Sequence, residues 1–260
     1  MGQAKKQWGF FPSPKDEAEP LDFFWGNTGK AKERDTSVYV SAIIPAFNEA
    51  RTIASTITSL KEVAGIDEII VVDDGSRDGT ADIARKAGAI TFTLVENVGK
   101  GCALEVGCAA SRGEILLLLD ADLEETAREA KALLGPVLAG EADLAVAVFP
   151  PSEGKAGLGL VQGLSRWAIR RSGGAALAQP LSGQRALRRH MWREIGGFGG
   201  GFGVETAMAM GVYRLGYRLV EVPVSMKHRQ TSRDWQGIVH RGRQLLHVLR
   251  VVIRHWRWLL

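Results

Sequence analysis

Five carboxylate residues of this sequence follow a run of apolar residues, either directly or within a few positions. The set consists of Glu49, Asp73, Asp74, Asp120 and Asp122. If the runs form parallel strands, their carboxyl ends meet at the edge of the sheet where ligands bind. Carboxylates gathered there need a cation, and their hard oxygens suit Mg²⁺ or Mn²⁺ better than Zn²⁺. The pattern indicates a divalent-metal site that receives an anionic substrate.

Each of these motifs taken alone also has an ordinary structural explanation. The Asp-Asp-Gly-Ser segment over 73–76 is a good turn and helix start, and the Asp-Ala-Asp segment over 120–122 suits a helix cap. We favour the metal hypothesis because the motifs stand at the ends of several separate apolar runs.

Alternating apolar runs and helical spacings supply the elements that would position these residues. The runs predict strands over 38–44, 66–72, 90–95, 114–119, 144–149 and 219–224, and the spacings predict helices over 53–63, 80–87, 101–111 and 124–138. Continuously apolar strands separated by helices are typical of an α/β fold with a mostly parallel sheet covered on both faces. A Gly-rich passage over 154–163 opens a less regular second half.

The composition is that of a globular protein. Of the 260 residues, 45% are hydrophobic and 24% are charged, which excludes a disordered chain. Cys102 and Cys108 are the two cysteines, which excludes a disulfide scaffold and suits a reducing compartment. The sequence has no run of 18 apolar residues and no apolar leader at its start, so we expect a cytoplasmic protein.

The domain organisation that we predict has three parts. Residues 1–37 form an N-terminal arm, residues 38–236 the α/β domain, and residues 237–260 a basic amphipathic helix. From Lys227 onward there are eight Lys and Arg residues and one acidic residue. Such a helix fits peripheral contact with an anionic membrane at its inner face, packing on the body, or a homodimer interface. A nucleic-acid partner is not expected, because the chain has no base-reading module and the remainder is acidic.

Several motifs together resemble a known enzyme family. The segments 42–49, 72–80 and 120–122 are similar to the nucleotide-sugar half of the family 2 glycosyltransferases, which have the GT-A fold. The segments 99–101, 179–183, 201–205 and 228–229 resemble, in order and spacing, the glucosyl-3-phosphoglycerate synthases and their mannosyl relatives. The resemblance extends over about residues 41–244, and the ordered combination is specific where each motif alone is weak.

The resemblance implies a binding site for a UDP-sugar donor, with UDP-glucose as the expected donor. The first motif would hold the uracil and ribose, with Glu49 at the edge of the base. Lys100, between two glycines, would reach the diphosphate as a point charge. The implied nucleotide-sugar residues are Pro45, Ala46, Phe47, Glu49, Asp74, Lys100, Asp120, Ala121, Ser182 and Gly183.

The resemblance also implies the metal ligands and the catalytic groups. Asp122 and His228 would bind Mg²⁺ or Mn²⁺, Lys100 and Arg229 would stabilise the diphosphate leaving group, and Glu205 would orient the sugar or the acceptor. Without the resemblance, Lys100 would equally fit an exposed lysine at a helix start, and Glu205 a first-turn residue that complements the helix dipole.

The stereochemistry and the acceptor depend on two departures from the family pattern. Inverting members have a Glu-Asp pair, with the Asp as base, where this chain has Glu205 and Thr206, which favours the retaining chemistry of the phosphoglycerate synthases. Those synthases hold the acceptor with an Arg and a Thr, whereas the stretch over 157–163 has no cation. The nearby arginines are substitutes for them or a solvated basic face; they are Arg166, Arg170 and Arg171. The acceptor therefore stays open, and the partner that we expect is a small anionic or a lipid-phosphate acceptor.

Two alternatives remain open at this point. One is an inverting family 2 transferase that uses a polyprenyl-phosphate acceptor at the membrane surface. The other is a nucleotide-sugar-binding protein without activity, which the presence of Asp122 and His228 disfavours.

Overall fold

The structure is a computed structural model that describes residues 38–150, 159–175, 177–197 and 204–226, with the two single positions 249 and 253. All of these belong to the unit that begins at Val38. The predicted arm over 1–37, the predicted boundary at residue 236 and most of the predicted helix over 237–260 lie outside the described residues.

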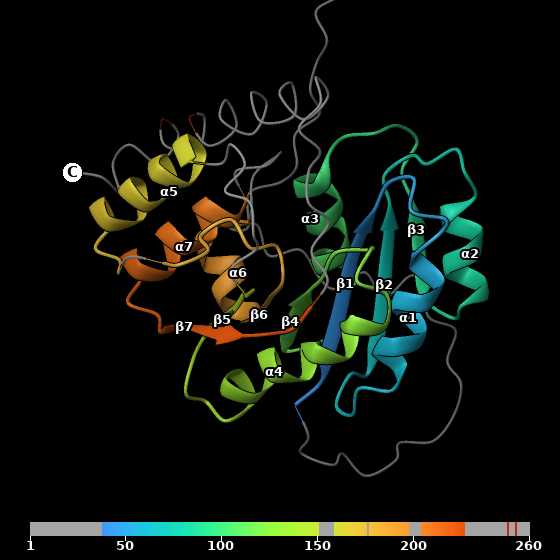
Figure 1. Cartoon of the computed structure of the whole chain (residues 1–260), viewed down its shortest axis with the longest axis horizontal. Helices are drawn as coiled ribbons and strands as arrows, with labels where there is room; N and C mark the ends of the chain where they lie inside the picture. The colour runs from blue at the N-terminus through green and yellow to red at the C-terminus, as the bar shows by residue number, and fades with distance from the viewer. Residues whose placement is uncertain are drawn as a thin grey trace, which may run out of the picture. The chain divides into compact units, whose positions relative to one another are not determined.

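The centre of the fold is a seven-stranded sheet in the order β3-β2-β1-β4-β6-β5-β7 (Figure 1). Its strands are β1 Val40–Ala46, β2 Glu68–Asp73, β3 Ile90–Thr93, β4 Ile115–Leu118, β5 Leu144–Val148, β6 Arg185–Arg188 and β7 Leu219–Pro223. All neighbouring pairs are parallel except the two that involve β6. The predicted mostly parallel α/β sheet is confirmed.

Strand β1 continues through Pro45 to Ala46, two residues beyond the point where we expected the strand to end. The carbonyl of Ile43 accepts a hydrogen bond from Leu119 on the β4 side, so the nitrogen of Pro45, two residues on, points to the same side. The register of β4 with β1 ends at Ile43 and Leu118. Pro45 has no N–H to continue this ladder, so it lies where the pairing with β4 stops, at the edge of the site.

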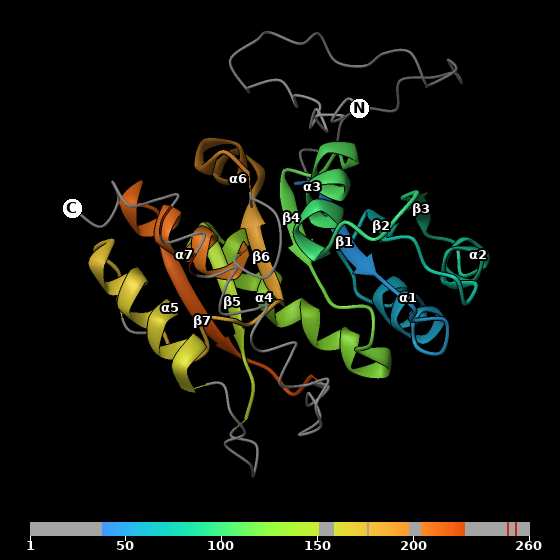
Figure 2. The same ribbon diagram turned by 90° about the horizontal axis from the view of Figure 1, so that it is seen from above.

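Helices cover both faces of the sheet. They are α1 Ile53–Lys61, α2 Thr80–Lys86, α3 Lys100–Ala110, the 3₁₀ helix η2 Glu124–Glu129, α4 Ala130–Leu138, α5 Gly159–Arg171, α6 Arg189–Ile195 and α7 Val204–Arg214. One core cluster joins α1, η2 and α4 to one face of the sheet, and a second joins α3, α6 and α7 to the other (Figure 2). Helix α5 packs on α7 through a third cluster. Within the described residues, no helix combines the length and the apolar character needed to cross a membrane.

Three sequence expectations differ from the structure. The predicted helix over 124–138 is divided into η2 and α4, and the expected irregular passage over 154–163 already belongs to α5 from Gly159 onward. Strand β6 was not predicted, because its four residues begin and end with arginine and present only a short apolar pair. This strand is inserted antiparallel between β4 and β5.

A close approach between α3 and β1 gives a test of this packing. A Cβ atom at Gly107 in α3 would lie 2.4 Å from the Ile43 side chain, whereas one at Gly163 in α5 would meet nothing within 4 Å. We expect Gly107→Ala to destabilise the fold by about 1–3 kcal/mol through overpacking. Gly163→Ala should stabilise it by about 1 kcal/mol through helix propensity. Denaturant unfolding of both variants measures the two signs, and a stabilising Gly107→Ala would contradict the packing.

Candidate functional site

Polar loops follow three parallel strands at one edge of the sheet. Strand β1 pairs in parallel with β2 and with β4, so the loops after Ala46, Asp73 and Leu118 leave the sheet at the same edge. The expectation that the carboxylates following these strands share one edge is confirmed.

The loop after β1 is held by the segment after β2. The amide of Asn48 donates to the hydroxyl of Ser76 at 2.8 Å, and the side-chain oxygen of Asn48 accepts from the amide of Arg77. The amide of Glu49 donates to the hydroxyl of Thr80 at 2.9 Å. The polar residues after Asp74 thus fix the backbone of the loop that carries Glu49. At the start of this loop, the side chain of Phe47 is 46% exposed.

Asp74 is buried and holds the approach to α3. Its two carboxylate oxygens accept hydrogen bonds from the amides of Val98 and Gly99, each at 2.8 Å. Gly99 has φ +97°, a conformation that favours glycine. Asp74 therefore fixes the turn from which Lys100, the first residue of α3, projects.

Lys100 joins two carboxylates from different parts of the chain. Its ammonium nitrogen lies 2.8 Å from Oδ1 of Asp120, which follows β4, and 3.4 Å from Oε1 of Glu205 in the first turn of α7. Burial lowers the pKa of Lys100, but the charges of Asp120 and Glu205 outweigh that effect and raise this pKa above its ordinary value. The ammonium group is therefore a fixed positive charge.

The segment before β6 completes the surroundings of Asp120. The buried amide of Gln184 donates to Oδ2 of Asp120 at 2.5 Å, and the hydroxyl of Ser182 donates to Gln184 at 3.5 Å. A Cβ atom at Gly183 would lie 2.5 Å from the Lys100 ammonium, so this glycine is needed for the close approach. Sequence reasoning missed Gln184, although its place directly after the motif over 179–183 was a usable signal.

The loop that carries Asp122 is fixed from helix α1. The hydroxyl of Thr56 donates to the carbonyl of Ala121 at 2.9 Å and accepts from the amide of Glu124 at 2.8 Å. Among the described residues, no group of three or more His, Cys, Asp or Glu side chains is placed to hold a metal ion by itself. The second predicted ligand, His228, lies outside the described residues, and so does Arg229.

The hydroxyl of Thr206 lies between two helices. It forms a hydrogen bond of 3.0 Å with the hydroxyl of Ser165 in α5, and both residues are fully buried. The adjacent Glu205 contacts Lys100 instead. Glu205 thus faces the site, whereas Thr206 packs between α5 and α7. Thr206 is at the position where, from the sequence, we expect the base of an inverting enzyme.

The three arginines of α5 have different surroundings. The guanidinium of Arg166 donates to the main-chain carbonyls of Leu177 and Ala178, so this side chain braces the following loop. Arg170 and Arg171 are exposed in the last turn. The interpretation of a solvated basic face fits the last two residues.

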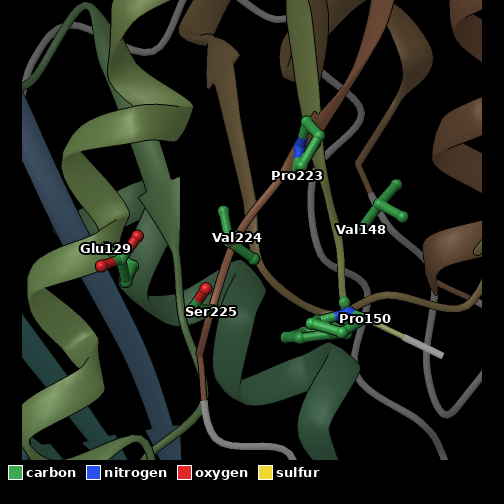
Figure 3. A pocket seen from close by; sticks show the side chains of 7 residues that line it. Glu129, Val148, Pro150, Pro223, Val224 and Ser225 are labelled. Atoms are coloured by element: carbon green, nitrogen blue, oxygen red, sulfur yellow. The ribbon is translucent and has the colours of Figure 1, made fainter. Parts of the chain in front are cut away.

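A pocket of about 350 Å³ lies where β5 and β7 end (Figure 3). Its lining is mostly apolar and consists of Glu129, Val148, Phe149, Pro150, Pro223, Val224 and Ser225. Phe149 and Val224 belong to the core cluster on the α1 and α4 face, whereas Lys100 and Glu205 are on α3 and α7 at the other face. The pocket is therefore not the polar cluster around Lys100.

Comparisons with known proteins show glycosyltransferases among the relatives of this chain. A glucosyl-3-phosphoglycerate synthase of Mycobacterium tuberculosis is 30% identical over 86% of this chain and 78% of its own length. A dolichyl-phosphate beta-glucosyltransferase of Trichomonas vaginalis is 34% identical over 42% of this chain, and an uncharacterised protein of Methanocaldococcus jannaschii is 37% identical over 41%. The matches with these last two relatives cover less than half of their length, 39% and 45% respectively.

Solved structures resemble the fold as a whole. The Mycobacterium tuberculosis synthase in complex with Mn²⁺, UDP-glucose and phosphoglyceric acid has a TM-score of 0.69 and 29% identity, covering 82% of this chain and 79% of that one. Mannosyl-3-phosphoglycerate synthase from Rubrobacter xylanophilus has a TM-score of 0.68 and 25% identity, covering 85% and 74%. These are GT-A structures, so the predicted GT-A fold is confirmed. A family model described as glycosyl transferase family 2 matches residues 41–184, and the chain belongs to that family.

Proposed function

We propose that this protein transfers glucose from UDP-glucose to a hydroxyl group of an anionic acceptor, with Mg²⁺ or Mn²⁺ and with retention at the anomeric carbon. The observation that carries the proposal is the Lys100 ammonium held between Asp120 and Glu205. These side chains come from α3, from the loop after β4 and from α7, and they gather a cation and two acids at the ligand-binding edge of the sheet. The UDP-glucose and Mn²⁺ of the mycobacterial synthase structure support the donor and the metal.

The donor would bind across the loops after β1, β2 and β4. Pro45, Ala46, Phe47 and Glu49 would surround the base, on a loop that Ser76 and Thr80 keep in place. Asp74 acts on the donor indirectly in this arrangement, because both of its oxygens bind the turn before Lys100. The pre-formed loops reduce the ordering cost of binding the nucleotide.

Carboxylate oxygens are suitable ligands for a hard divalent ion, and Asp122 is the metal ligand that we assign. Asp120 has one oxygen bonded to Lys100 and the other to Gln184, so its carboxylate is committed to shaping the site. Asp122 follows on a loop that Thr56 fixes through Ala121. A bound Mg²⁺ or Mn²⁺ would neutralise charge on the diphosphate leaving group. His228 stays a prediction as the second ligand.

In the proposed reaction, the bond between the anomeric carbon and the β-phosphate oxygen breaks, and the acceptor oxygen bonds to that carbon on the same face. The departing phosphate oxygen takes the acceptor proton, so no side chain has to act as a base. The buried Thr206–Ser165 hydrogen bond supports this chemistry, because no carboxylate stands at that position. Lys100 would stabilise the phosphate charge, and Glu205 would orient the sugar or the acceptor.

A second candidate is an inverting transferase with a polyprenyl-phosphate acceptor. The similarity to the dolichyl-phosphate beta-glucosyltransferase favours it. That match covers less than half of either protein, whereas the match to the phosphoglycerate synthase covers most of both. We therefore prefer a small anionic acceptor, for which phosphoglyceric acid is the first compound to test. A homodimer and membrane contact through residues 237–260 remain predictions.

Removal of the assigned metal ligand gives the first test of this function. We expect Asp122→Ala to abolish the gain in UDP affinity that Mn²⁺ produces, since one anionic oxygen ligand is lost. Calorimetry of UDP binding with and without Mn²⁺ measures the gain. Asp82→Ala removes an exposed carboxylate in α2 and should behave as wild type. A full Mn²⁺-dependent gain in Asp122→Ala would refute the assignment.

Crowding of Lys100 gives a second test. We expect Gly183→Ala to push the ammonium group away from Asp120 and to weaken UDP binding by about tenfold, equivalent to ~1.4 kcal/mol. Gly163→Ala, whose new methyl group meets no neighbour, is the matched control. Calorimetry reads both affinities, and unchanged UDP binding in Gly183→Ala would mean that the position of Lys100 does not matter to the nucleotide.

The stereochemical outcome distinguishes the two candidate reactions. We expect UDP-α-glucose to give an α-linked product, identified by the anomeric NMR signal. Glu205→Gln should lose less than about 100-fold in kcat, because the residue orients by hydrogen bonding, whereas loss of a general base costs about 10²–10⁴-fold. A β-linked product, together with an inactive Glu205→Gln that still binds UDP, would favour the polyprenyl-phosphate reaction instead.

A further inference from the structure

A fully buried arginine lies next to the site without contacting any of its carboxylates. Arg185 begins β6, pairs in register with Leu118 at the end of β4, and is 1% exposed. Its guanidinium donates to three main-chain carbonyls: Nη2 to Pro180 at 2.9 Å, Nε to Ser182 at 2.9 Å and Nη1 to Glu205 at 3.0 Å. Among the described residues, its hydrogen-bond partners are these neutral carbonyls, and burying a cation in such surroundings is costly, so its retention needs a reason.

The three carbonyls belong to the two segments that meet at Lys100. Pro180 and Ser182 lie in the loop that ends at Gly183, against the ammonium group, and Glu205 supplies the more distant of its two carboxylates. The preceding residue, Gln184, holds Asp120. One guanidinium therefore ties the wall of the site to the first turn of α7, and its neighbour in sequence ties the same wall to the loop after β4.

We infer that Arg185 is a positioning residue for the transfer reaction. By binding main-chain carbonyls both in the loop next to Lys100 and at Glu205, it sets the distance between Glu205 and Lys100. The inference rests on the proposed function for its kinetic consequence and on the hydrogen bonds alone for its structural one. Burial lowers the pKa of Arg185 to about 10, so the guanidinium stays charged at neutral pH. Errors of about 1 Å in such positioning can cost about 100-fold in rate.

The chain offers a matched control in Arg189. This arginine, also close to β6, donates to the carbonyls of Gly113 and Cys108 and to the hydroxyl of Ser111, at the opposite end of β4. Arg189→Met thus removes a comparable set of three hydrogen bonds away from the site. We expect this variant to lose stability without the effect on Glu205.

The experiment compares Arg185→Met, Arg185→Lys and Arg189→Met by kinetics with UDP-glucose and by hydrogen exchange. We expect Arg185→Met to lose about 100-fold in kcat with little change in KM for UDP-glucose. Arg189→Met should keep kcat within about threefold of wild type, although we expect its Tm to fall by an amount similar to that of Arg185→Met. Arg185→Lys, which keeps the charge but reaches fewer carbonyls, should fall between wild type and Arg185→Met.

Hydrogen exchange makes the test independent of activity. Arg185→Met should raise amide exchange in peptides over 179–184 and 204–208 and leave 111–113 protected, and Arg189→Met should do the reverse. If the wild-type chain does not turn over UDP-glucose, the proposed function fails, and the exchange pattern alone decides the inference about Arg185.

Three results would overturn the inference. The first is equal kcat in Arg185→Met and Arg189→Met, and the second is a rise in KM with kcat unchanged. The third is wild-type exchange over 179–184 and 204–208. Should Arg185→Met fail to fold, Arg185→Lys carries the test: intermediate kcat and local exchange support the inference, and wild-type values for both refute it.

Discussion

The site depends on one electrostatic arrangement, in which the ammonium group of Lys100 lies between the carboxylates of Asp120 and Glu205. Without that cation, two carboxylates from different parts of the chain would face each other with no positive charge between them. The ammonium group supplies that charge to both. Much of the surrounding structure serves to keep it there, from the carboxylate of Asp74 beneath the turn at Gly99 to the missing side chain at Gly183.

The two faces of the sheet contribute differently to this arrangement. Helix α1 acts on the loop after β4 through Thr56, and helices α3 and α7 supply Lys100 and Glu205 from the opposite face. The core clusters of both faces are apolar and continuous up to the strand ends. The packing of the helices therefore fixes the positions of Lys100 and Glu205, and the hydrogen bond from Gln184 helps to fix that of Asp120 on its loop.

The sequence predicted the part of the fold in which apolar runs alternate with helical spacing, because local patterns suffice there. Strands β1, β2 and β4 and the shared edge of their carboxylates follow from such patterns. Strand β6 could not be found in this way, since Arg185 and Arg188 hide a central strand whose burial is decided by distant neighbours. The role of Asp74 was also beyond the sequence, because its partners Val98 and Gly99 are reached only after the chain has folded.

The insertion of β6 has a consequence for the order in which the chain can assemble. Strands β1 to β4 pair among themselves in parallel, with β4 beside β1, whereas the neighbours of β5 in the sheet are β6 and β7, both later in the sequence. Asp120 and Lys100 can thus be in place while Gln184 and Glu205 are still absent. The ion cluster can therefore close only once α7, the helix before β7, has been made, and a chain that stops short of β6 would lack both Gln184 and Glu205.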